Sequence, residues 1–252
     1  MSLSEWLSKH HCLHYTKKRN RSPLVMAAAS SSHAFLDVPP KLREEFHAVY
    51  AADPTPRWIC EVASEPLFRL FFDVDLPEDA LTPEVTKQSP GGAAAIEDVT
   101  RAGIDHLVMV LVRVLEENGS SMDRRCLVLG CTGASGARKG GRAHGYHIHC
   151  PGIKTDEDGA RGLRQHFVDA LFDAPSCPLQ VPDWAVAIDS SVYTHKTCRM
   201  LGSRKATKGQ DVGRTYRLLA AYDKTGQRDL GTEADYRSDA PSLLADASIR
   251  LD

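Results

Sequence analysis

The sequence has no apolar run that approaches the length of a membrane span, which argues against a membrane-embedded chain. No apolar segment of the signal-peptide type lies near the N-terminus, so secretion is not expected. The seven cysteines are scattered and form no C-x-x-C pair. That scatter argues against a zinc ribbon and against a disulfide framework, and it indicates an intracellular, reducing compartment. No internal repeat is visible.

Charge is distributed unevenly, although the formal net charge is only -2. From Asp37 to Asp98 the acidic residues outnumber the basic ones 13 to 5, whereas from His195 to Arg217 seven basic residues accompany one acid. The first region could bind a metal ion and the second a polyanion, although a solvated basic loop explains the second equally well. With 252 residues of ordinary composition, the chain is long enough for one large domain or two small ones.

The stretch RLFFDVDL, residues 69–76, predicts a buried strand that ends in two acids. Side chains alternate between the faces of a strand, so Asp73 and Asp75 share one face while the apolar residues share the other and can pack on a core. Two ionised carboxylates this close repel each other, and a divalent cation removes that conflict. Because hard oxygen ligands suit Mg²⁺ or Mn²⁺, the pair is a candidate metal site. A strand whose polar end simply reaches solvent is the alternative.

A second candidate site follows a loop rich in glycine and basic residues. The stretch HGYHIH predicts a strand on which His147 and His149 share a face with Gly145. Gly145 leaves room beside His147 for a bulky ligand. The preceding loop carries Lys139 and Arg142, and such loops can form backbone N–H nests for anions. One histidine on a strand is more often structural, but two on one face beside this loop favour a functional site.

A third acid, Asp189, is expected at the end of a strand over residues 184–189, and a segment with basic and hydroxyl side chains follows it. Acids at the ends of different strands, with basic residues and a histidine nearby, are typical of metal-dependent phosphoryl transfer. Two cations held by shared carboxylates would stabilise the attacking and leaving oxygens. Arginine, lysine and histidine side chains would neutralise a triphosphate.

The remaining patterns predict a mixture of helices and strands. Helices are expected over residues 39–52, with Pro at the start, over 96–118, and from a capping box at Thr155 and Asp158 to Phe172. Strands are expected over 57–62, over 67–76 as its hairpin partner or neighbour, over 126–130, over 145–150, which Pro151 and Gly152 end, and over 215–222. Residues after Asp223 are polar and weakly patterned. By themselves these patterns indicate an α+β or α/β fold.

The order of the motifs resembles that of the archaeo-eukaryotic primase superfamily, and most closely its primase-polymerases and the primase domains of large DNA viruses. The shared order is D-x-D, then a small residue-x-His, then a hydrophobic residue before Asp, followed downstream by Arg and S-x-K. Upstream, the segment SHAFLDVP at residues 32–39, a helix and Glu61 follow the layout of the viral group. The resemblance extends over residues 33–222.

The resemblance implies a metal-dependent nucleotidyltransferase with DNA primase and/or DNA polymerase activity. In the superfamily the acids bind the catalytic Mg²⁺ or Mn²⁺, and the matching positions here are Asp73, Asp75 and Asp189. The nucleotide-binding set would consist of His147, Arg199, Ser203, Lys205, Gly145, Lys139 and Arg142. The template strand would be held mainly through its phosphates, by Lys196, Arg204, Lys208 and Arg214.

Three departures from the superfamily pattern bear on function. Gly145 replaces the superfamily's Ser, and Ala143 stands where primase-polymerases often carry Lys, so Lys139 or Arg142 would have to substitute. The zinc-binding module that commonly follows the core is absent from these 252 residues. The chain is therefore expected to be either a catalytic core cut from a longer protein or a minimal polymerase.

The implied fold is α+β (mixed α/β), with an RRM-like sheet that carries the three motifs and an N-terminal α/β unit beside it. The expected division is a flexible basic tail over residues 1–32, the catalytic domain over 33–222, and an extension of the core or the start of a linker over 223–252. The expected partners are a single-stranded DNA template and dNTP or NTP, and no membrane. A helicase, fused or separate, is a further candidate. Nucleus, organelle and viral replication site stay open as locations.

Two other functions fit some of the same residues. The His147–His149 pair with Tyr193 and Lys196 resembles HUH replication-initiator endonucleases, in which the histidines bind a metal and the tyrosine attacks a DNA phosphodiester. This alternative assigns no role to the acids and needs Tyr193 on a helix, whereas the sequence predicts a strand end and turn. The other alternative is an inactive nucleic-acid-binding module, which would present stacking aromatics on the open face of an RRM-like sheet.

Overall fold

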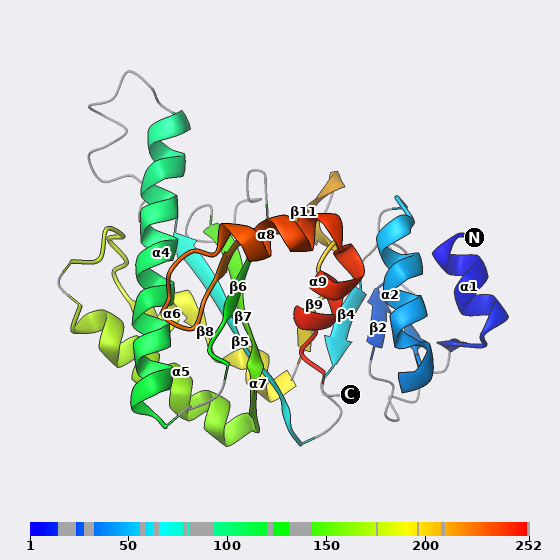
Figure 1. The fold of residues 1–252 in the computed structure, drawn as a ribbon, viewed down its shortest axis with the longest axis horizontal. Coiled ribbons are helices and arrows are strands. Elements are labelled where there is room, and N and C mark those ends of the chain that lie inside the picture. The colour runs from blue at the N-terminus through cyan, green and yellow to red at the C-terminus, as the bar shows by residue number, and fades with distance from the viewer. Residues whose placement is uncertain are drawn as a thin grey trace.

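The computed structural model describes residues 1–14, 24–27, 33–55, 59–62, 66–77, 80, 93–119, 123–131, 143–174, 176–195, 197–207 and 210–250. They form two antiparallel sheets, one with six strands and one with five, together with helices that pack against both (Figure 1). This arrangement confirms the expected α+β class.

The larger sheet contains the split β-α-β-β-α-β arrangement of an RRM-like fold. Its elements in chain order are β5 (Phe68–Pro77), α4 (Ala93–Glu117), β6 (Cys126–Cys131), β7 (Ala143–Thr155), α5 (Glu157–Phe172) and β8 (Ile188–Asp189). These strands lie in the order β6-β7-β5-β8, so the two strands that follow the helices flank an inner pair. Two later strands, β11 (Gln210–Tyr222) and β10 (Arg204–Thr207), extend the sheet beyond β6.

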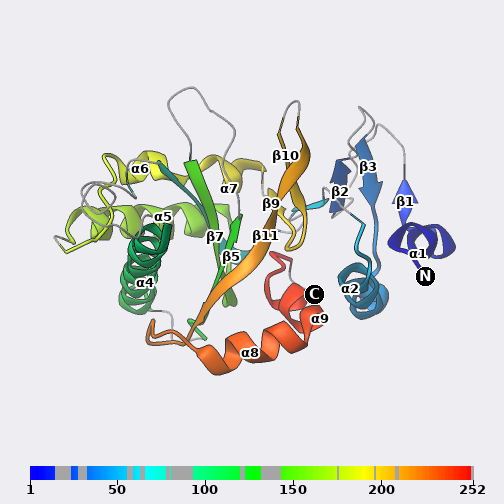
Figure 2. The ribbon, with the colours of Figure 1, turned by 90° about the horizontal axis from the view of Figure 1, so that it is seen from above.

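The helices α4 and α5 cover one face of this sheet, as Figure 2 shows. From β5 they bury Leu70, Phe72 and Val74, while Asp73 and Asp75 between them are half-buried on the opposite face. The apolar stripe expected on the long helix is buried in the same core, so both periodicities are confirmed.

The smaller sheet has the strand order β1-β3-β2-β4-β9. Its strands are β1 (Leu13–His14), β2 (Leu24–Ala27), β3 (His33–Leu36), β4 (Ile59–Val62) and β9 (Thr197–Arg199). A second core forms where α1 (Leu3–Lys9) and α2 (Arg43–Ala52) pack on it, with Trp6 and Phe46 fully buried. A 3₁₀ turn, η1 (Pro40–Leu42), leads into α2, which confirms the helix expected after the two prolines.

The C-terminal residues join the two sheets. Helices α8 (Leu230–Ser238) and α9 (Ala240–Asp246) pack over the β6 and β11 end of the larger sheet, on the face opposite α4 and α5. After α9, the carboxylate of Glu61 on β4 accepts hydrogen bonds from Ser248 Oγ at 2.7 Å and from the Ile249 amide at 2.9 Å. The Arg69 amide on β5 donates to the Ile249 carbonyl at 2.8 Å, so one short segment links a strand of each sheet.

The structure describes helices at both ends of the chain. Within residues 1–32, Leu3–Lys9 is a helix with a complete capping box between Ser2 and Glu5, and its buried Trp6 donates to Glu45. A flexible tail therefore does not describe that segment. The polar region after Asp223 forms α8 and α9, which are short helices with few apolar residues and therefore give little periodic signal in the sequence. The division of the chain at residues 32 and 222 stays a prediction.

Local corrections have identifiable causes. The strand expected to end at Pro151 continues to Thr155, because the register shifts where Leu70 faces Cys150 and Arg69 faces Lys154, and an irregularity of this kind tolerates proline. The cap of α5 is Asp156 rather than Thr155, since Asp156 accepts from the Gly159 amide.

Two further corrections concern β4, β5 and the segment before Asp189. Strands β4 and β5 were expected to pair or neighbour each other, but they belong to different sheets. Residues 184–187 form a short helix, α6 (Trp184–Ala187), and only Ile188–Asp189 is strand. Trp184 and Ala187 are both buried, which suits a helical turn better than an alternating strand.

Candidate active site

The three sequence motifs meet on neighbouring strands of the larger sheet. Asp73 on β5 lies directly opposite Asp189 on β8 and directly opposite His147 on β7. Residues opposed in this way point to the same face, so the three side chains form a row across β8, β5 and β7. Asp75 lies opposite Gly145 in the same register. The structure therefore brings together the acids and the histidine expected to form the site; their roles in catalysis stay predictions.

The row is partly buried and its side chains have defined neighbours. Asp73 Oδ1 lies 3.7 Å from His147 Nε2, with 25% of the aspartate side chain exposed against 6% of the histidine. Asp189 accepts hydrogen bonds from the Ser191 amide at 2.7 Å and from Ser191 Oγ at 2.9 Å, which ties it to the start of α7 (Ser191–His195). The acids thus occupy fixed positions on a face that α4 and α5 leave uncovered.

The carboxylate set has the chemistry of a hard-cation site. Asp73, Asp75 and Asp189 supply only oxygen ligands, which suit Mg²⁺ or Mn²⁺. Each carboxylate has more lone-pair positions than one hydrogen bond uses, so the bonds from Ser191 leave Asp189 able to bind a cation. The three acids therefore fit a hard divalent cation. Among the described residues, however, they are not a set whose ligand atoms all lie within 4.8 Å of one another.

Beside the acids, a cluster of His147, His149 and Cys198 does have its ligand atoms within 4.8 Å of one another. Cys198 Sγ on β9 lies 3.5 Å from His147 Nδ1 and 3.9 Å from His149 Nε2, and all three side chains are buried. Burial, aided by the charge of Arg69, lowers the pKa of His149 to about 3. Burial, with the nearby carboxylates of Glu61 and Asp73, raises the pKa of the Cys198 thiol well above its usual range. Without a ligand, the thiol and the His149 ring are therefore neutral.

Sequence reasoning missed Cys198. It treated the cysteines as a scattered set, and nothing in the spacing between residues 147 and 198 shows that β9 crosses to β7. The one available signal is that Cys198 directly precedes Arg199, a residue already assigned to the site.

Aromatic rings hold the two histidines in place. Tyr216 stacks on His147 with ring centroids 4.1 Å apart, and Phe71 stacks on His149 at 6.1 Å. Both aromatic side chains are buried. These two rings are therefore not available as exposed platforms for bases, which an inactive RRM-like binding module would require.

Tyr193 lies on a helix, as the endonuclease alternative requires, but it is not presented to a substrate. Its side chain is fully buried, and its hydroxyl donates to the Phe71 carbonyl at 2.8 Å. Burial raises the pKa of this phenol well above its usual range. A buried, protonated hydroxyl that is already hydrogen-bonded is poorly suited to attack a DNA phosphate.

The residues expected to bind phosphate occupy different settings. Arg199 is half-buried on β9, next to the cluster residue Cys198 and opposite Cys60. Ser203 is fully buried: its Oγ accepts from the Ile59 amide at 3.0 Å and shares a hydrogen bond with Tyr50 Oη at 3.0 Å. This placement gives Ser203 a structural role between α2 and β4, and it does not present the hydroxyl to a ligand.

The other basic residues are less defined. Lys205 faces Arg214 and Arg204 faces Thr215 across the β10–β11 pair, so three of the expected contacts share one hairpin. The side chains of Lys205, Arg204 and Arg214 lie outside the described part of the structure, as do the whole residues Lys139, Arg142, Lys196 and Lys208.

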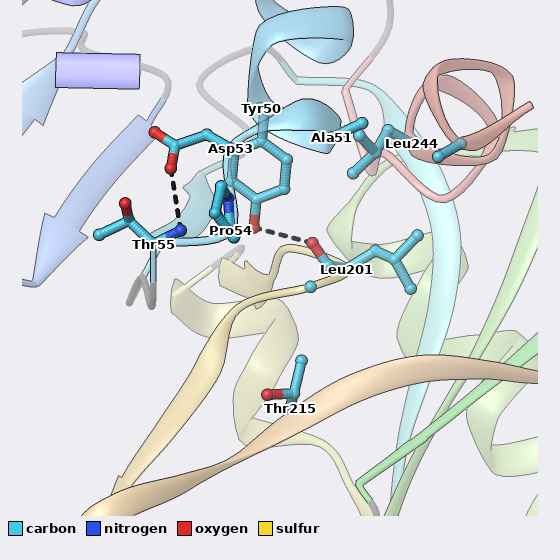
Figure 3. A pocket seen from close by; sticks show the side chains of 10 residues that line it. Tyr50, Ala51, Asp53, Pro54, Thr55, Leu201, Thr215 and Leu244 are labelled. Carbon is cyan, nitrogen blue, oxygen red and sulfur yellow. Dashed lines mark hydrogen bonds between the residues drawn. The ribbon is translucent and has the colours of Figure 1, made fainter. Parts of the chain in front are cut away.

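A pocket of ≈ 280 Å³ lies beside Ser203 rather than at the acids (Figure 3). Tyr50 reaches across one side and donates to the Leu201 carbonyl at 2.8 Å, while Leu244 of α9 and Thr215 of β11 line other sides. None of its lining residues belongs to the expected site. The pocket therefore adds nothing to the assignment of the acids.

Comparison with known families agrees with the geometry. Residues 1–171 match the family model PPL4, described as Prim-pol 4, and the matched segment includes Asp73, Asp75 and His147 but ends before Asp189. A comparison with curated proteins finds no match. No helix in the described part of the chain is both long and apolar enough to span a membrane. Because the match covers more than half of the 252 residues, the chain belongs to the Prim-pol 4 family of primase-polymerase domains.

Proposed function

We propose that this protein is a metal-dependent nucleotidyltransferase that extends a DNA strand on a single-stranded DNA template, with DNA primase and/or DNA polymerase activity. Membership of a primase-polymerase family supports nucleic-acid synthesis in general terms. The observation that carries the finer proposal is the row of Asp189, Asp73 and His147 across three adjacent strands.

Asp73, Asp75 and Asp189 would hold Mg²⁺ or Mn²⁺, and the bound ion would supply positive charge to the reacting phosphate oxygens. The 3′-hydroxyl of the growing strand, or of a first nucleotide, attacks the α-phosphate of an incoming nucleoside triphosphate. A new P–O bond forms while the bond to the β-phosphate breaks, pyrophosphate leaves, and the hydroxyl proton passes to solvent. Through the bound ion, the half-buried carboxylates on β5 and β8 would position the reacting groups.

His147 would contact the triphosphate through Nε2, the ring nitrogen on the Asp73 side. Arg199 lies one residue from Cys198, which contacts the same ring, so its guanidinium is a candidate for the neighbouring phosphate oxygens. On the β10–β11 pair, Lys205 would bind the triphosphate, and Arg204 and Arg214 would bind the template backbone with little base specificity.

A primer-dependence assay tests this proposal. The purified protein is given a single-stranded template, labelled dNTP or NTP, and Mg²⁺ or Mn²⁺, with and without a primer. Products without a primer indicate primase activity, and products only with a primer indicate polymerase activity. No product under any combination, or a covalent protein–DNA adduct in place of synthesis, would overturn the proposal.

The variant Asp189→Asn tests the third acid of the site. Asparagine can still accept the hydrogen bond from the Ser191 amide through Oδ1, and its Nδ2 can donate to Ser191 Oγ, but it lacks the charge that a cation requires. We expect this variant to fold normally and to lose synthesis. Full synthesis by Asp189→Asn would remove the third acid from the site and leave the proposal resting on β5 alone.

A further inference from the structure

The cluster of His147, His149 and Cys198 joins the two sheets at the candidate active site. The two histidines project from β7 of the six-stranded sheet, and the cysteine comes from β9 of the five-stranded sheet. All three side chains are buried, and their ligand atoms lie within 4.8 Å of one another. A nitrogen-and-sulfur set of this kind differs in chemistry from the oxygen ligands of the acids beside it.

The spacing matches that of a tetrahedral ion. Zinc binds sulfur at about 2.3 Å and imidazole nitrogen at about 2.0 Å, so a tetrahedral site places the two kinds of ligand atom about 3.5 Å apart. The observed distances from Cys198 Sγ are 3.5 Å to His147 Nδ1 and 3.9 Å to His149 Nε2. Shifts of a few tenths of an ångström would bring both nitrogens to that separation from the sulfur.

We propose that His147 Nδ1, His149 Nε2 and Cys198 Sγ bind one Zn²⁺ ion, which fastens β9 to β7 beside the catalytic acids. Imidazole and thiolate ligands select a zinc-like ion, whereas Mg²⁺ and Mn²⁺ prefer oxygen. Binding replaces the thiol proton, which passes to solvent. Three protein ligands leave the fourth position of the tetrahedron to a water molecule.

The surroundings of His147 support this site. Metal-bound histidines commonly direct their second ring nitrogen to a carboxylate, and Asp73 Oδ1 lies 3.7 Å from His147 Nε2. With Nδ1 on the ion, Nε2 must carry the hydrogen and can only donate. The ion would therefore fix His147 as a donor on the side of Asp73 and the triphosphate. Because Arg199 follows Cys198 on β9, the ion would also hold Arg199 beside β7.

Metal content tests the site without reference to synthesis, so its failure is distinguishable from failure of the proposed polymerase. The full chain is loaded with Zn²⁺, dialysed, and analysed for zinc by elemental analysis. We expect about one tightly bound ion per chain, and loss of that ion in Cys198→Ala. Cys60→Ala is the matched control, because Cys60 lies on the neighbouring strand β4 opposite Arg199 and outside the cluster; it should keep the ion.

Cobalt provides a second measurement. Co²⁺ in the wild-type chain should show the thiolate charge-transfer absorption of a tetrahedral sulfur site, and Cys198→Ala should lose it. If Cys198→Ala does not fold, the wild-type chain alone decides: its thermal midpoint should rise with Zn²⁺ and fall on chelation. A zinc-free wild-type chain, or equal zinc in the Cys198→Ala and Cys60→Ala variants, would overturn the proposal and leave the cluster as a buried thiol–imidazole contact.

Discussion

The two sheets differ in where their strands come from. The RRM-like part of the six-stranded sheet uses residues 68–189, a single stretch that contains the acids and His147. The five-stranded sheet uses strands from the first 62 residues and then β9, which arrives only after Asp189. The larger sheet thus carries the groups expected to do chemistry, whereas the smaller one brings Cys198 and Arg199 against them. Changes on the polar face of the first should affect activity, and changes in the second, outside β9, should mainly affect stability.

The largest expected effect separates the two faces of β5. Asp73→Ala with Asp75→Ala should abolish synthesis but leave the free energy of unfolding little changed, since the two ionised acids repel each other. Phe72→Ala, on the opposite face of the same strand, removes a fully buried ring and should cost about 3–5 kcal/mol of stability. Primer extension and urea unfolding measure the two effects. Full synthesis by the Asp73→Ala, Asp75→Ala variant would contradict the assignment of these acids to the metal site.

An intermediate effect on synthesis is expected at His147, which lies opposite Asp73. His147→Ala should slow nucleotide incorporation by about 10²-fold, the scale for removing one positioned donor to a developing charge. Tyr193→Phe should leave synthesis almost unchanged, because its hydroxyl is used only to bond the Phe71 carbonyl. Its cost is to stability, about 1 kcal/mol for a lost buried hydrogen bond. Single-turnover nucleotide incorporation by both variants measures these effects. If the wild type formed a protein–DNA adduct and Tyr193→Phe formed none and was inactive, the endonuclease alternative would be favoured.

Much of the larger sheet could be predicted from local pattern. The alternation from Leu70 to Leu76 specified which face of β5 would be buried, and the stripe on α4 specified which side of the helix would cover it. The D-x-D acids and His147 were predictable because their side-chain direction follows from strand geometry alone. The register that sets Asp73 opposite both Asp189 and His147 was not, since pairing between distant strands leaves no local periodicity.

The parts that sequence could not predict depend on contacts between segments far apart in the chain. Cys198 becomes a site residue only because β9 pairs with β4 and its side chain reaches the histidines on β7. Ser203 matched a motif but is used to bond Ile59 and Tyr50, which no spacing reveals. The proline-glycine pair after Cys150 was misread as a strand end, because a local shift in register accommodates it.

The last expected effect concerns pH and lies at the α2 helix, which packs on the smaller sheet. His47 on α2 is buried among the arginines 43, 69 and 250, and burial together with these positive charges lowers its pKa from 6.5 to about 4. Glu61 is the acid that interacts with the same three arginines. Between those values the unfolded chain binds a proton that the folded chain does not, so the free energy of unfolding falls as the pH is lowered from 6.5 toward 4. One such group contributes a slope of at most about 1.4 kcal/mol per pH unit.

His47→Gln should flatten that slope while changing stability above pH 7 only by the cost of the substitution itself. Urea unfolding at a series of pH values from neutral to about 4.5 measures it, with each protein compared with its own value above pH 7. His149, whose pKa is lowered to about 3, titrates in the same direction in both proteins and cancels in the difference. Parallel stability curves for wild type and His47→Gln would show that His47 binds its proton equally in the folded and unfolded chains. The acid sensitivity would then arise from groups other than His47.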